Sequence, residues 1–234
     1  MGVPSIFIRF GGCNLTCTGF STQITSPKDN SKLIGCDSIR AVNKKHFISQ
    51  WRQLDAYKDL LQEINSYDTK AKDLVFTGGE PLLHYENQIF YEALEFLIKD
   101  GCRITIETNA TMDIDFEKYP IYKKVIFAMS PKLSISGESE SKRLNIEAIN
   151  NINKNTTYSF LKIVLNEKHI KKLDMELKNI LDKISKIDVY CMALSSNMEE
   201  LNTNAIFVAQ YAIQNSFRYS DRLQVRLWNN KDKA

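Results

Sequence analysis

Three cysteines near the start of the chain have the residue type and spacing to hold an iron–sulfur cluster. Cys13 and Cys17 lie four positions apart, and eighteen residues separate Cys17 from Cys36. Thiolate sulfur is the ligand that iron in such clusters requires, and three cysteines leave one iron open to another ligand. Cys13 and Cys17 lie among Gly, Asn and Thr residues, without the apolar periodicity that would bury them. We therefore expect a cluster with an open iron at these thiols.

A zinc site and a set of buried core cysteines are the alternatives. Zinc would require a fourth Cys or His at short spacing, and the nearest candidate, His46, lies in a Lys-Lys-His-Phe run typical of a surface turn. Cys102 and Cys191 lie inside or beside apolar runs, and we expect both to be core residues. A zinc-binding interaction module with a β/α fold stays open as a non-enzymatic alternative.

A glycine pair follows the apolar run Leu74–Phe76. In the motif Thr77-Gly78-Gly79-Glu80-Pro81, the glycines would free the backbone to approach a ligand, and the carboxylate would suit an ammonium group. For this motif alone, an ordinary strand-to-helix turn is the alternative.

Two further polar motifs come directly after apolar runs. Glu107 begins the run Glu-Thr-Asn-Ala-Thr, which includes Asn109, and Ser130-Pro131-Lys132 follows later. Polar side chains at strand ends supply hydrogen bonds to polar ligands, and a hydroxyl and an ammonium two residues apart can serve one ligand. Taken alone, Thr, Asn and Pro are also common at the start of loops.

These motifs together resemble those of a known enzyme family. The segments RFGGCNLTC, from Arg9, and CDS, from Cys36, together with GGEPLL, ETNAT and SPK, are similar to those of 7-carboxy-7-deazaguanine synthases, members of the radical S-adenosylmethionine (SAM) superfamily. The resemblance extends from Pro4 to Lys231. The superfamily usually has two residues between its second and third cysteines, and several members of this family carry an insertion there.

The resemblance implies roles for individual residues. It assigns Cys13, Cys17 and Cys36 to a [4Fe–4S] cluster, Gly78, Gly79, Glu80, Asn109, Ser130 and Lys132 to SAM, Arg9, Thr77 and Glu107 to the substrate, and Ser38 to Mg²⁺. A guanidinium can grip a carboxylate with two hydrogen bonds, and a hydroxyl oxygen is a hard ligand suited to Mg²⁺. An exposed strand arginine is the alternative for Arg9.

The reaction that the resemblance implies converts 6-carboxy-5,6,7,8-tetrahydropterin to 7-carboxy-7-deazaguanine with release of ammonia. This is a carbon–nitrogen lyase step of queuosine biosynthesis, a tRNA modification pathway. A flavodoxin-type reductant and a homodimer are implied with it. Another radical SAM enzyme, an activase that generates a glycyl radical on a partner protein, is the alternative. ETNAT, SPK and the ending LWNNK favour the pterin enzyme.

The family also has a turn of the type SIQGEG before its cysteine motif, whose Gln and Glu contact the pterin. This chain begins Met1-Gly2-Val3-Pro4-Ser5, where that turn would be ending. We therefore expect the chain as given to bind the cluster and SAM but to turn over the pterin poorly, because a site that hydrogen-bonds its substrate discriminates less well without those groups.

Apolar runs alternate with helical patterns along most of the chain. The expected strands are Ser5–Phe10, Leu74–Phe76, Arg103–Glu107, Lys124–Met129, Ser159–Leu165, Asp188–Leu194 and Leu223–Trp228. The expected helices are Leu54–Ile64, Ile89–Ile98, Ser141–Ile152, Ile170–Ile184 and Met198–Gln214. This order favours an α/β fold, a partial (β/α) barrel of about six parallel strands with its site at their carboxyl ends.

We expect a single radical SAM domain over residues 1–234, with a cluster loop inserted at about 13–38. Within that loop, the polar stretch Ser21–Lys32 has no periodic pattern and reads as a long loop of functional or mobile type.

Composition narrows the remaining possibilities. The chain has 31 basic and 28 acidic residues, and a formal charge of +3 is too weak to indicate nucleic acid. It has neither an apolar run long enough to cross a membrane nor a signal-peptide pattern. Five cysteines, three of them grouped as ligands, argue against a secreted disulfide framework. A reducing cytoplasm is the expected location.

Overall fold

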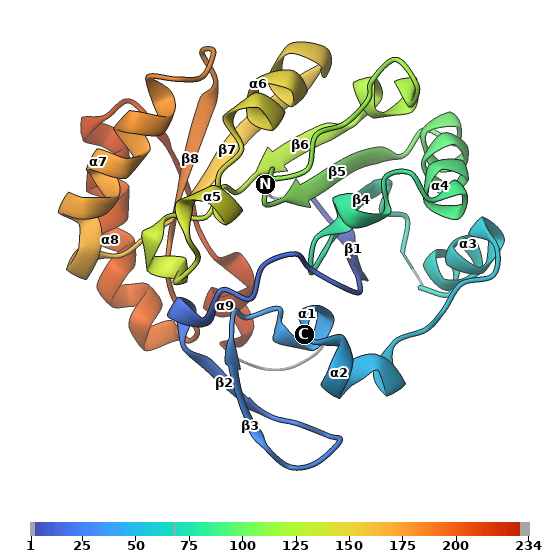
Figure 1. The fold of residues 1–234 in the computed structure, drawn as a ribbon, viewed down its shortest axis with the longest axis horizontal. Helices are drawn as coiled ribbons and strands as arrows, with labels where there is room; N and C mark the ends of the chain where they lie inside the picture. Colours follow the sequence, from blue (N-terminus) through green and yellow to red (C-terminus); the bar gives the residue numbers. More distant parts are fainter. Residues whose placement is uncertain (1–2, 68, 230–234) are drawn as a thin grey trace.

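The computed structural model describes residues 3–67 and 69–229, and its main feature is a seven-stranded parallel sheet. The strands, in their order across the sheet, are β1 (Ser5–Phe10), β4 (Asp73–Gly78), β5 (Arg103–Thr108), β6 (Ile126–Met129), β7 (Tyr158–Leu165), β8 (Asp188–Ala193) and β9 (Arg218–Ser220). Every neighbouring pair is parallel. β1 and β9 are the two edges, so the curved sheet forms an open, partial barrel (Figure 1).

Helices connect the strands and cover the outer face of the sheet (Figure 1). The α-helices are α1 (Ile39–Val42), α2 (Lys44–Phe47), α3 (Tyr57–Asn65), α4 (Gln88–Lys99), α5 (Glu140–Arg143), α6 (Ile146–Asn155), α7 (Ile170–Leu181), α8 (Met198–Gln214) and α9 (Leu223–Trp228). Side chains define where several of them begin. The Asn87 side chain accepts hydrogen bonds from two amides at the start of α4, and Asn145 does the same for one amide of α6.

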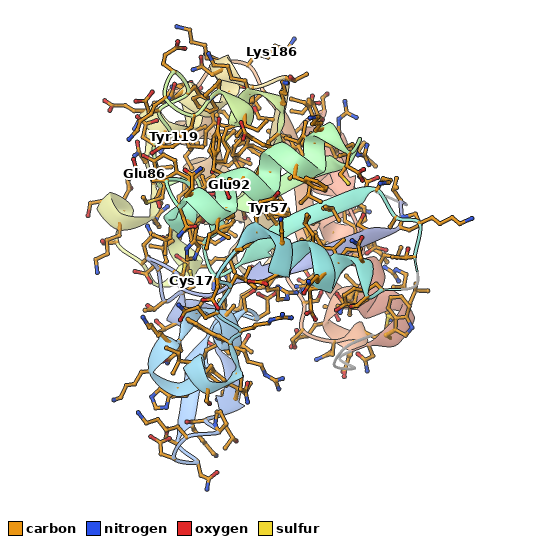
Figure 2. The ribbon with its side chains drawn as sticks, turned by 90° about the vertical axis from the view of Figure 1, so that its right-hand side faces the viewer. Cys17, Tyr57, Glu86, Glu92, Tyr119 and Lys186 are labelled. Atoms are coloured by element: carbon orange, nitrogen blue, oxygen red, sulfur yellow. The ribbon has the colours of Figure 1, made fainter. Side chains whose placement is uncertain are left out.

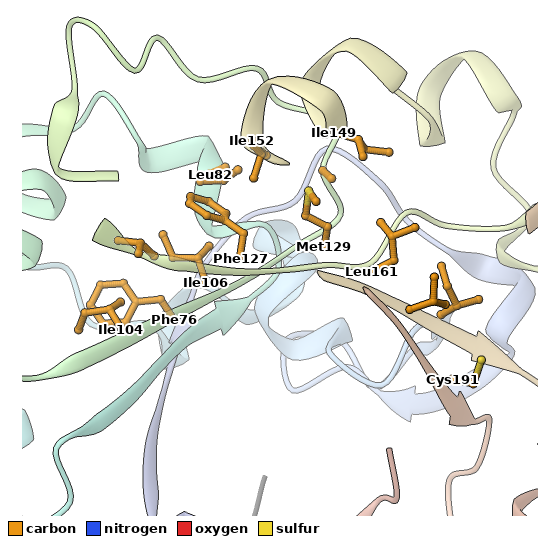
Figure 3. Packing of buried hydrophobic residues seen from close by; sticks show 14 of the residues in the cluster. Phe76, Leu82, Ile104, Ile106, Phe127, Met129, Ile149, Ile152, Leu161 and Cys191 are labelled. Atoms are coloured by element: carbon orange, nitrogen blue, oxygen red, sulfur yellow. The ribbon is translucent and has the colours of Figure 1, made fainter. Parts of the chain in front are cut away.

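The hydrophobic core lies between the sheet and these helices. In β7, Ser159, Leu161, Ile163 and Leu165 are buried while the residues between them are not, which is the alternation expected of a strand with one covered face. Figure 3 shows side chains from the central strands meeting Ile149 and Ile152 of α6. Burial of each large apolar side chain contributes roughly 1.5–3 kcal/mol to the stability of the folded protein. The apolar side chains between sheet and helices therefore stabilise the sheet.

The opposite, inner face of the sheet carries the polar residues. Thr77 of β4, Glu107 of β5 and Lys162 of β7 alternate with the core residues on their strands. Arg9 of β1 is paired in register with Thr77. The strand alternation that buries the core therefore turns these four side chains toward the barrel interior.

A β-hairpin is inserted between Cys17 and Cys36. Its strands are β2 (Thr22–Thr25) and β3 (Lys32–Gly35), and their antiparallel register pairs Thr22 with Gly35. Figures 1 and 2 show this hairpin extending away from the rest of the protein, with Cys17 at its base.

The predicted fold class is confirmed, with seven strands in place of about six. One predicted strand is wrong: Leu223–Trp228 is helix α9, and the seventh strand is Arg218–Ser220. The expected long loop Ser21–Lys32 is also wrong in part, since it contains β2 and the hairpin turn. Of the N-terminal run, Met1 and Gly2 lie outside the described residues, as do Asn230 and Lys231 of the LWNNK ending.

Within the described ranges, none of the helices has both the length and the apolar character needed to cross a bilayer.

Candidate functional site

The loops that carry Cys13, Cys17 and Cys36 meet at the carboxyl end of the sheet. Burial raises the pKa of the Cys13 thiol to about 11 and that of Cys17 to about 12, and it also raises the pKa of Cys36. The Lys132 ammonium opposes the rise at all three thiols, so one cation lies within electrostatic range of each. The Leu15 amide donates a hydrogen bond to Cys13 Sγ at 3.4 Å.

The described residues contain no group of three or more His, Cys, Asp and Glu side chains placed to hold a metal ion.

The GGE turn packs directly against the cysteine loop. The Gly79 amide donates to Phe10 O at 3.0 Å, and the Glu80 amide donates to Gly12 O at 2.8 Å. A Cβ atom on Gly79 would lie 1.9 Å from Gly12 O, and Gly78 has a φ of 127°. Gly79 cannot carry a side chain, because the cysteine loop occupies the space that a Cβ atom would fill.

The Glu80 side chain is fully buried, and its carboxylate joins the turn after β4 to the end of β5. Oε1 accepts from the Leu82 amide at 2.9 Å and from the Thr108 hydroxyl at 2.7 Å, and Oε2 accepts from the Asn109 amide at 2.7 Å. Burial raises the pKa of Glu80. Because both oxygens already have partners inside the protein, the carboxylate ties the ends of β4 and β5 together.

Asn109 links the end of β5 to the cysteine loop. Its side-chain nitrogen Nδ2 donates to Asn14 Oδ1 at 2.9 Å, and the side-chain nitrogen of Asn14 donates to the Thr111 hydroxyl at 2.7 Å. Asn14 and Thr111 also line a polar pocket of about 430 Å³ that extends toward α5 and α6. The CNLTC and ETNAT motifs are thus in direct contact.

A second polar cluster lies on the inner face of the sheet. The Thr77 hydroxyl donates to Glu107 Oε2 at 3.1 Å, and Lys162 Nζ donates to Glu107 Oε1 at 2.6 Å. Burial would raise the pKa of Glu107, but the charge and hydrogen bond of Lys162 and the Thr77 hydroxyl hold it below its usual value. Lys162 was not anticipated, although its place in the alternation of β7 is a signal that could have found it.

Ser130 and Lys132 follow β6, at the same end of the sheet as the cysteines. Lys132 Nζ donates to Ser130 O at 3.0 Å and contacts the Ser130 hydroxyl at 3.1 Å. The Lys132 charge also lowers the pKa of Glu80 and of Glu107 against their burial. This ammonium group is therefore central to the collection of thiols and carboxylates.

Ser38 follows Cys36 and Asp37 at the start of α1. Its hydroxyl donates to Asp37 Oδ1 at 3.3 Å, and Arg222 pairs with Asp37 Oδ2 at 3.2 Å. Desolvation opposes ionisation of Asp37, yet Arg222, Lys132 and the exposed Arg9 together keep its pKa low. The structure thus places Arg9 within electrostatic range of Asp37, the neighbour of Ser38.

Cys102 and Cys191 are core residues, as predicted. Cys191 is buried in the core and Cys102 is partly buried against it, and both thiols are free. His46 is not in a surface turn as predicted: it lies in helix α2, and its Nδ1 forms a hydrogen bond with the buried Ser26 hydroxyl at 2.8 Å.

Glu138 is a site residue that gave no signal in the sequence. Its Oε1 accepts hydrogen bonds from the Thr16 amide at 2.6 Å, the Thr16 hydroxyl at 2.7 Å and the Cys17 amide at 2.9 Å. More than a hundred residues separate it from Cys17 along the chain, as the residue numbers show.

Similarity to known proteins agrees with this arrangement. No family model matches the chain. It is 28% identical over 249 residues to the 7-carboxy-7-deazaguanine synthase of Halobacterium salinarum, covering 98% of this chain and 84% of that protein. The synthase of Rhodopirellula baltica is 25% identical, with 98% of this chain and 81% of that protein covered. The Escherichia coli synthase is 30% identical over 151 residues, which is 64% of this chain and 62% of the relative.

Among solved structures, Streptococcus suis SuiB bound to its precursor peptide SuiA has a TM-score of 0.59 and 16% identity to this chain. The similarity covers 95% of this chain but only 49% of SuiB, so the chain spans about half the length of that protein. SuiB bound to S-adenosylmethionine gives the same TM-score. At this identity the likeness concerns the fold. The chain is therefore a relative of the 7-carboxy-7-deazaguanine synthases and has the fold of radical SAM enzymes, which use SAM and a [4Fe–4S] cluster.

Proposed function

We propose that the chain is a radical SAM enzyme that converts 6-carboxy-5,6,7,8-tetrahydropterin to 7-carboxy-7-deazaguanine with release of ammonia, in queuosine biosynthesis. The observation that carries the proposal is the joining of the CNLTC, GGE, ETNAT and SPK segments at one end of the sheet, through contacts such as Glu80–Asn109 and Asn109–Asn14. Similarity to curated synthases along 98% of the chain supports the same substrate. Since those relatives are synthases, the glycyl radical activase is not favoured.

Cys13, Cys17 and Cys36 would hold the [4Fe–4S] cluster. Their loops meet beside the Lys132 ammonium, and the Leu15 amide already donates to Cys13 Sγ, the kind of hydrogen bond that tunes cluster sulfurs. When bound, the cluster and SAM supply the radical that begins the reaction. The protein binds and orients the reactants and excludes water.

The turns at the ends of β4, β5 and β6 would bind SAM. The Glu80 carboxylate is occupied by Leu82, Thr108 and Asn109, and the Gly79 and Glu80 amides donate to Phe10 O and Gly12 O. The backbone carbonyl groups of Gly78 and Gly79 are therefore the acceptors in this turn that we assign to the SAM amino group. Ser130 and Lys132, which contact each other, offer a hydroxyl and a cation to the ribose and the carboxylate of SAM.

The pterin would lie against the inner face of the sheet. Glu107 is held ionised and oriented by Thr77 and Lys162, and a fixed carboxylate suits the N–H donors of a pterin ring. Arg9 is exposed beside the cysteine loop and offers a guanidinium to the substrate carboxylate. We add Lys162 to the substrate site as the residue that positions Glu107.

Ser38 would contribute to a Mg²⁺ site. Its hydroxyl oxygen lies 3.3 Å from Asp37 Oδ1, which puts two hard oxygen donors side by side next to Cys36. Water and substrate oxygens would complete the six ligands that Mg²⁺ prefers.

We further propose a single domain for the chain, a flavodoxin-type reductant, and a homodimer as the assembled form. Free thiols at all five cysteines suit a reducing cytoplasm.

The test is anaerobic. The chain is reconstituted with iron and sulfide and incubated with SAM, Mg²⁺, dithionite and the carboxypterin, and products are identified by mass spectrometry. Formation of 7-carboxy-7-deazaguanine, lost in a Cys13→Ala, Cys17→Ala, Cys36→Ala triple variant, supports the proposal. A chain that assembles the cluster and cleaves SAM but leaves the carboxypterin unchanged contradicts it.

A further inference from the structure

Glu138 lies where a segment from the far half of the chain meets the cysteine loop. One carboxylate oxygen accepts three hydrogen bonds, from the amide and hydroxyl of Thr16 and from the Cys17 amide. Three donors on one carboxylate oxygen make a strong, charge-assisted contact.

The backbone of Cys17 has an unusual conformation at this contact. Its φ of 49° and ψ of 46° lie in the left-handed region, which is unfavourable for a residue other than glycine. Such a conformation persists only where surrounding contacts hold it. The hydrogen bond from the Cys17 amide to the Glu138 carboxylate is one such contact.

Residues 133–138, which we call the clasp segment, follow the SPK motif and pack closely on the loop after Cys17. A Cβ atom on Gly19 would lie 2.1 Å from Ile135 O, so this contact admits only glycine. The Glu138 amide donates to the buried Ser136 hydroxyl at 3.3 Å. The clasp segment therefore presents Glu138 from an ordered backbone.

Two side chains hold the clasp segment from its other side. Arg143 is buried and donates to Lys132 O at 2.7 Å, and it also pairs with Glu176 at 3.4 Å. Glu176 in turn accepts from the Ser134 amide at 2.8 Å. Lys132, whose charge acts on all three thiols, and the start of the clasp segment are thus joined through Arg143 and Glu176.

We infer that Glu138 is a positioning residue for the cluster, with two effects. Its oxygen holds the Cys17 backbone in the conformation that presents the thiolate, and its negative charge lowers the reduction potential of the bound cluster, since net charge near a cluster is one determinant of that potential. This inference rests on the proposed function only in taking Cys17 as a cluster ligand. It does not depend on the pterin.

Two substitutions separate the two effects. Glu138→Gln keeps a carbonyl oxygen that can accept the same hydrogen bonds but removes the charge. Glu138→Ala removes both. Glu95→Gln, which makes the same charge change on the outer helix α4, is the matched control. After anaerobic reconstitution of each protein, iron and sulfide are counted per chain, and a dithionite titration followed by electron paramagnetic resonance gives the potential for adding one electron to the cluster.

We expect Glu138→Gln to keep its iron and to have a more positive potential, Glu138→Ala to lose most of its iron, and Glu95→Gln to match the wild type in both. Circular dichroism of each apo-protein checks that the fold is intact. Wild-type potential in Glu138→Gln together with full iron in Glu138→Ala overturns the inference while leaving the proposed reaction standing. These results need no carboxypterin, so absence of pterin turnover with the expected shifts would contradict only the reaction. A wild-type chain without a four-iron cluster would overturn both.

Discussion

The Glu80 carboxylate accepts a 2.7 Å hydrogen bond from the Asn109 amide, so the turn after β4 is bonded to the turn after β5 deep inside the protein. Through Asn109 the connection continues to Asn14 and the cysteine loop. Glu80, which the sequence motif predicts to bind SAM, thus also stabilises the arrangement of the turns that form the site.

Glu80→Gln should destabilise the protein. An amide nitrogen in place of Oε2 would face the Asn109 amide, donor against donor, leaving a buried N–H without a partner at a cost of about 1–3 kcal/mol. Urea unfolding followed by circular dichroism measures this loss, and Glu95→Gln on the exposed surface of α4 should stay within about 0.5 kcal/mol of the wild type. Equal stability of the two variants would mean that the Glu80 contacts contribute little.

Lys162→Met should destabilise the protein in a pH-dependent way. Folding lowers the pKa of Glu107 below its usual 4.5, because Lys162 and Thr77 outweigh the effect of burial. A carboxylate of this kind stabilises the fold above the unfolded pKa and loses that contribution as the pH falls through the folded pKa. The expected cost of Lys162→Met is about 1–3 kcal/mol at neutral pH, and it should shrink as the medium becomes more acidic than pH 4.5.

Urea unfolding of the wild type and Lys162→Met at several pH values tests whether the difference in their free energies of unfolding shrinks as the pH falls. The double variant with Glu107→Gln should cost less than the sum of the two single changes, because the partners interact directly. A constant difference between wild type and Lys162→Met at all pH values would argue that Lys162 acts through packing alone.

Single cysteine substitutions should divide the thiols into two groups. Cys13→Ala, Cys17→Ala and Cys36→Ala each remove one proposed iron ligand and should lose most of the reconstituted iron, measured per chain. Cys102→Ala, at the partly buried thiol away from these loops, is the control and should retain it. Full iron in Cys36→Ala would refute the assignment of a ligand beyond the hairpin.

Ser38→Ala should weaken the response of turnover to Mg²⁺ while SAM cleavage continues. The substitution removes the oxygen beside Asp37 without touching a cysteine. Turnover rates measured against Mg²⁺ concentration test this, and an unchanged dependence would exclude Ser38 from a metal site. Ser185→Ala, which removes an exposed hydroxyl between α7 and β8, is a matched control for loss of a serine oxygen.

The sheet could be predicted because its signal is local. Apolar runs between helical patterns gave six of the strands in chain order, and the strand ends placed the motifs at one end of the sheet. Leu223–Trp228 could not be predicted in the same way. Leu223, Val225 and Leu227 alternate as in a strand, but Leu223 and Leu227 are also four apart, and six residues are too few to separate the two periods.

The site residues likewise differ in whether their signal is local in the sequence. The motifs consist of neighbouring residues, so Cys13, Glu80 and Lys132 could be proposed as site residues from the sequence alone. Glu138 could not, because its role arises from a contact with Thr16 and Cys17 across a separation of more than a hundred residues, which only the folded chain brings together.

The hairpin between Cys17 and Cys36 makes the distance between these thiols insensitive to the number of residues that separate them. Pairing of Thr22 with Gly35 closes the excursion at its base, and everything beyond that pair can change length without altering the base. Even for an unstructured loop, each doubling of its length raises the entropic cost of bringing its ends together by only about 0.6 kcal/mol. Residues added or deleted in pairs, one on each strand, would preserve the register, so the length of this hairpin can vary in evolution while Cys17 and Cys36, the proposed ligands beside it, stay in place.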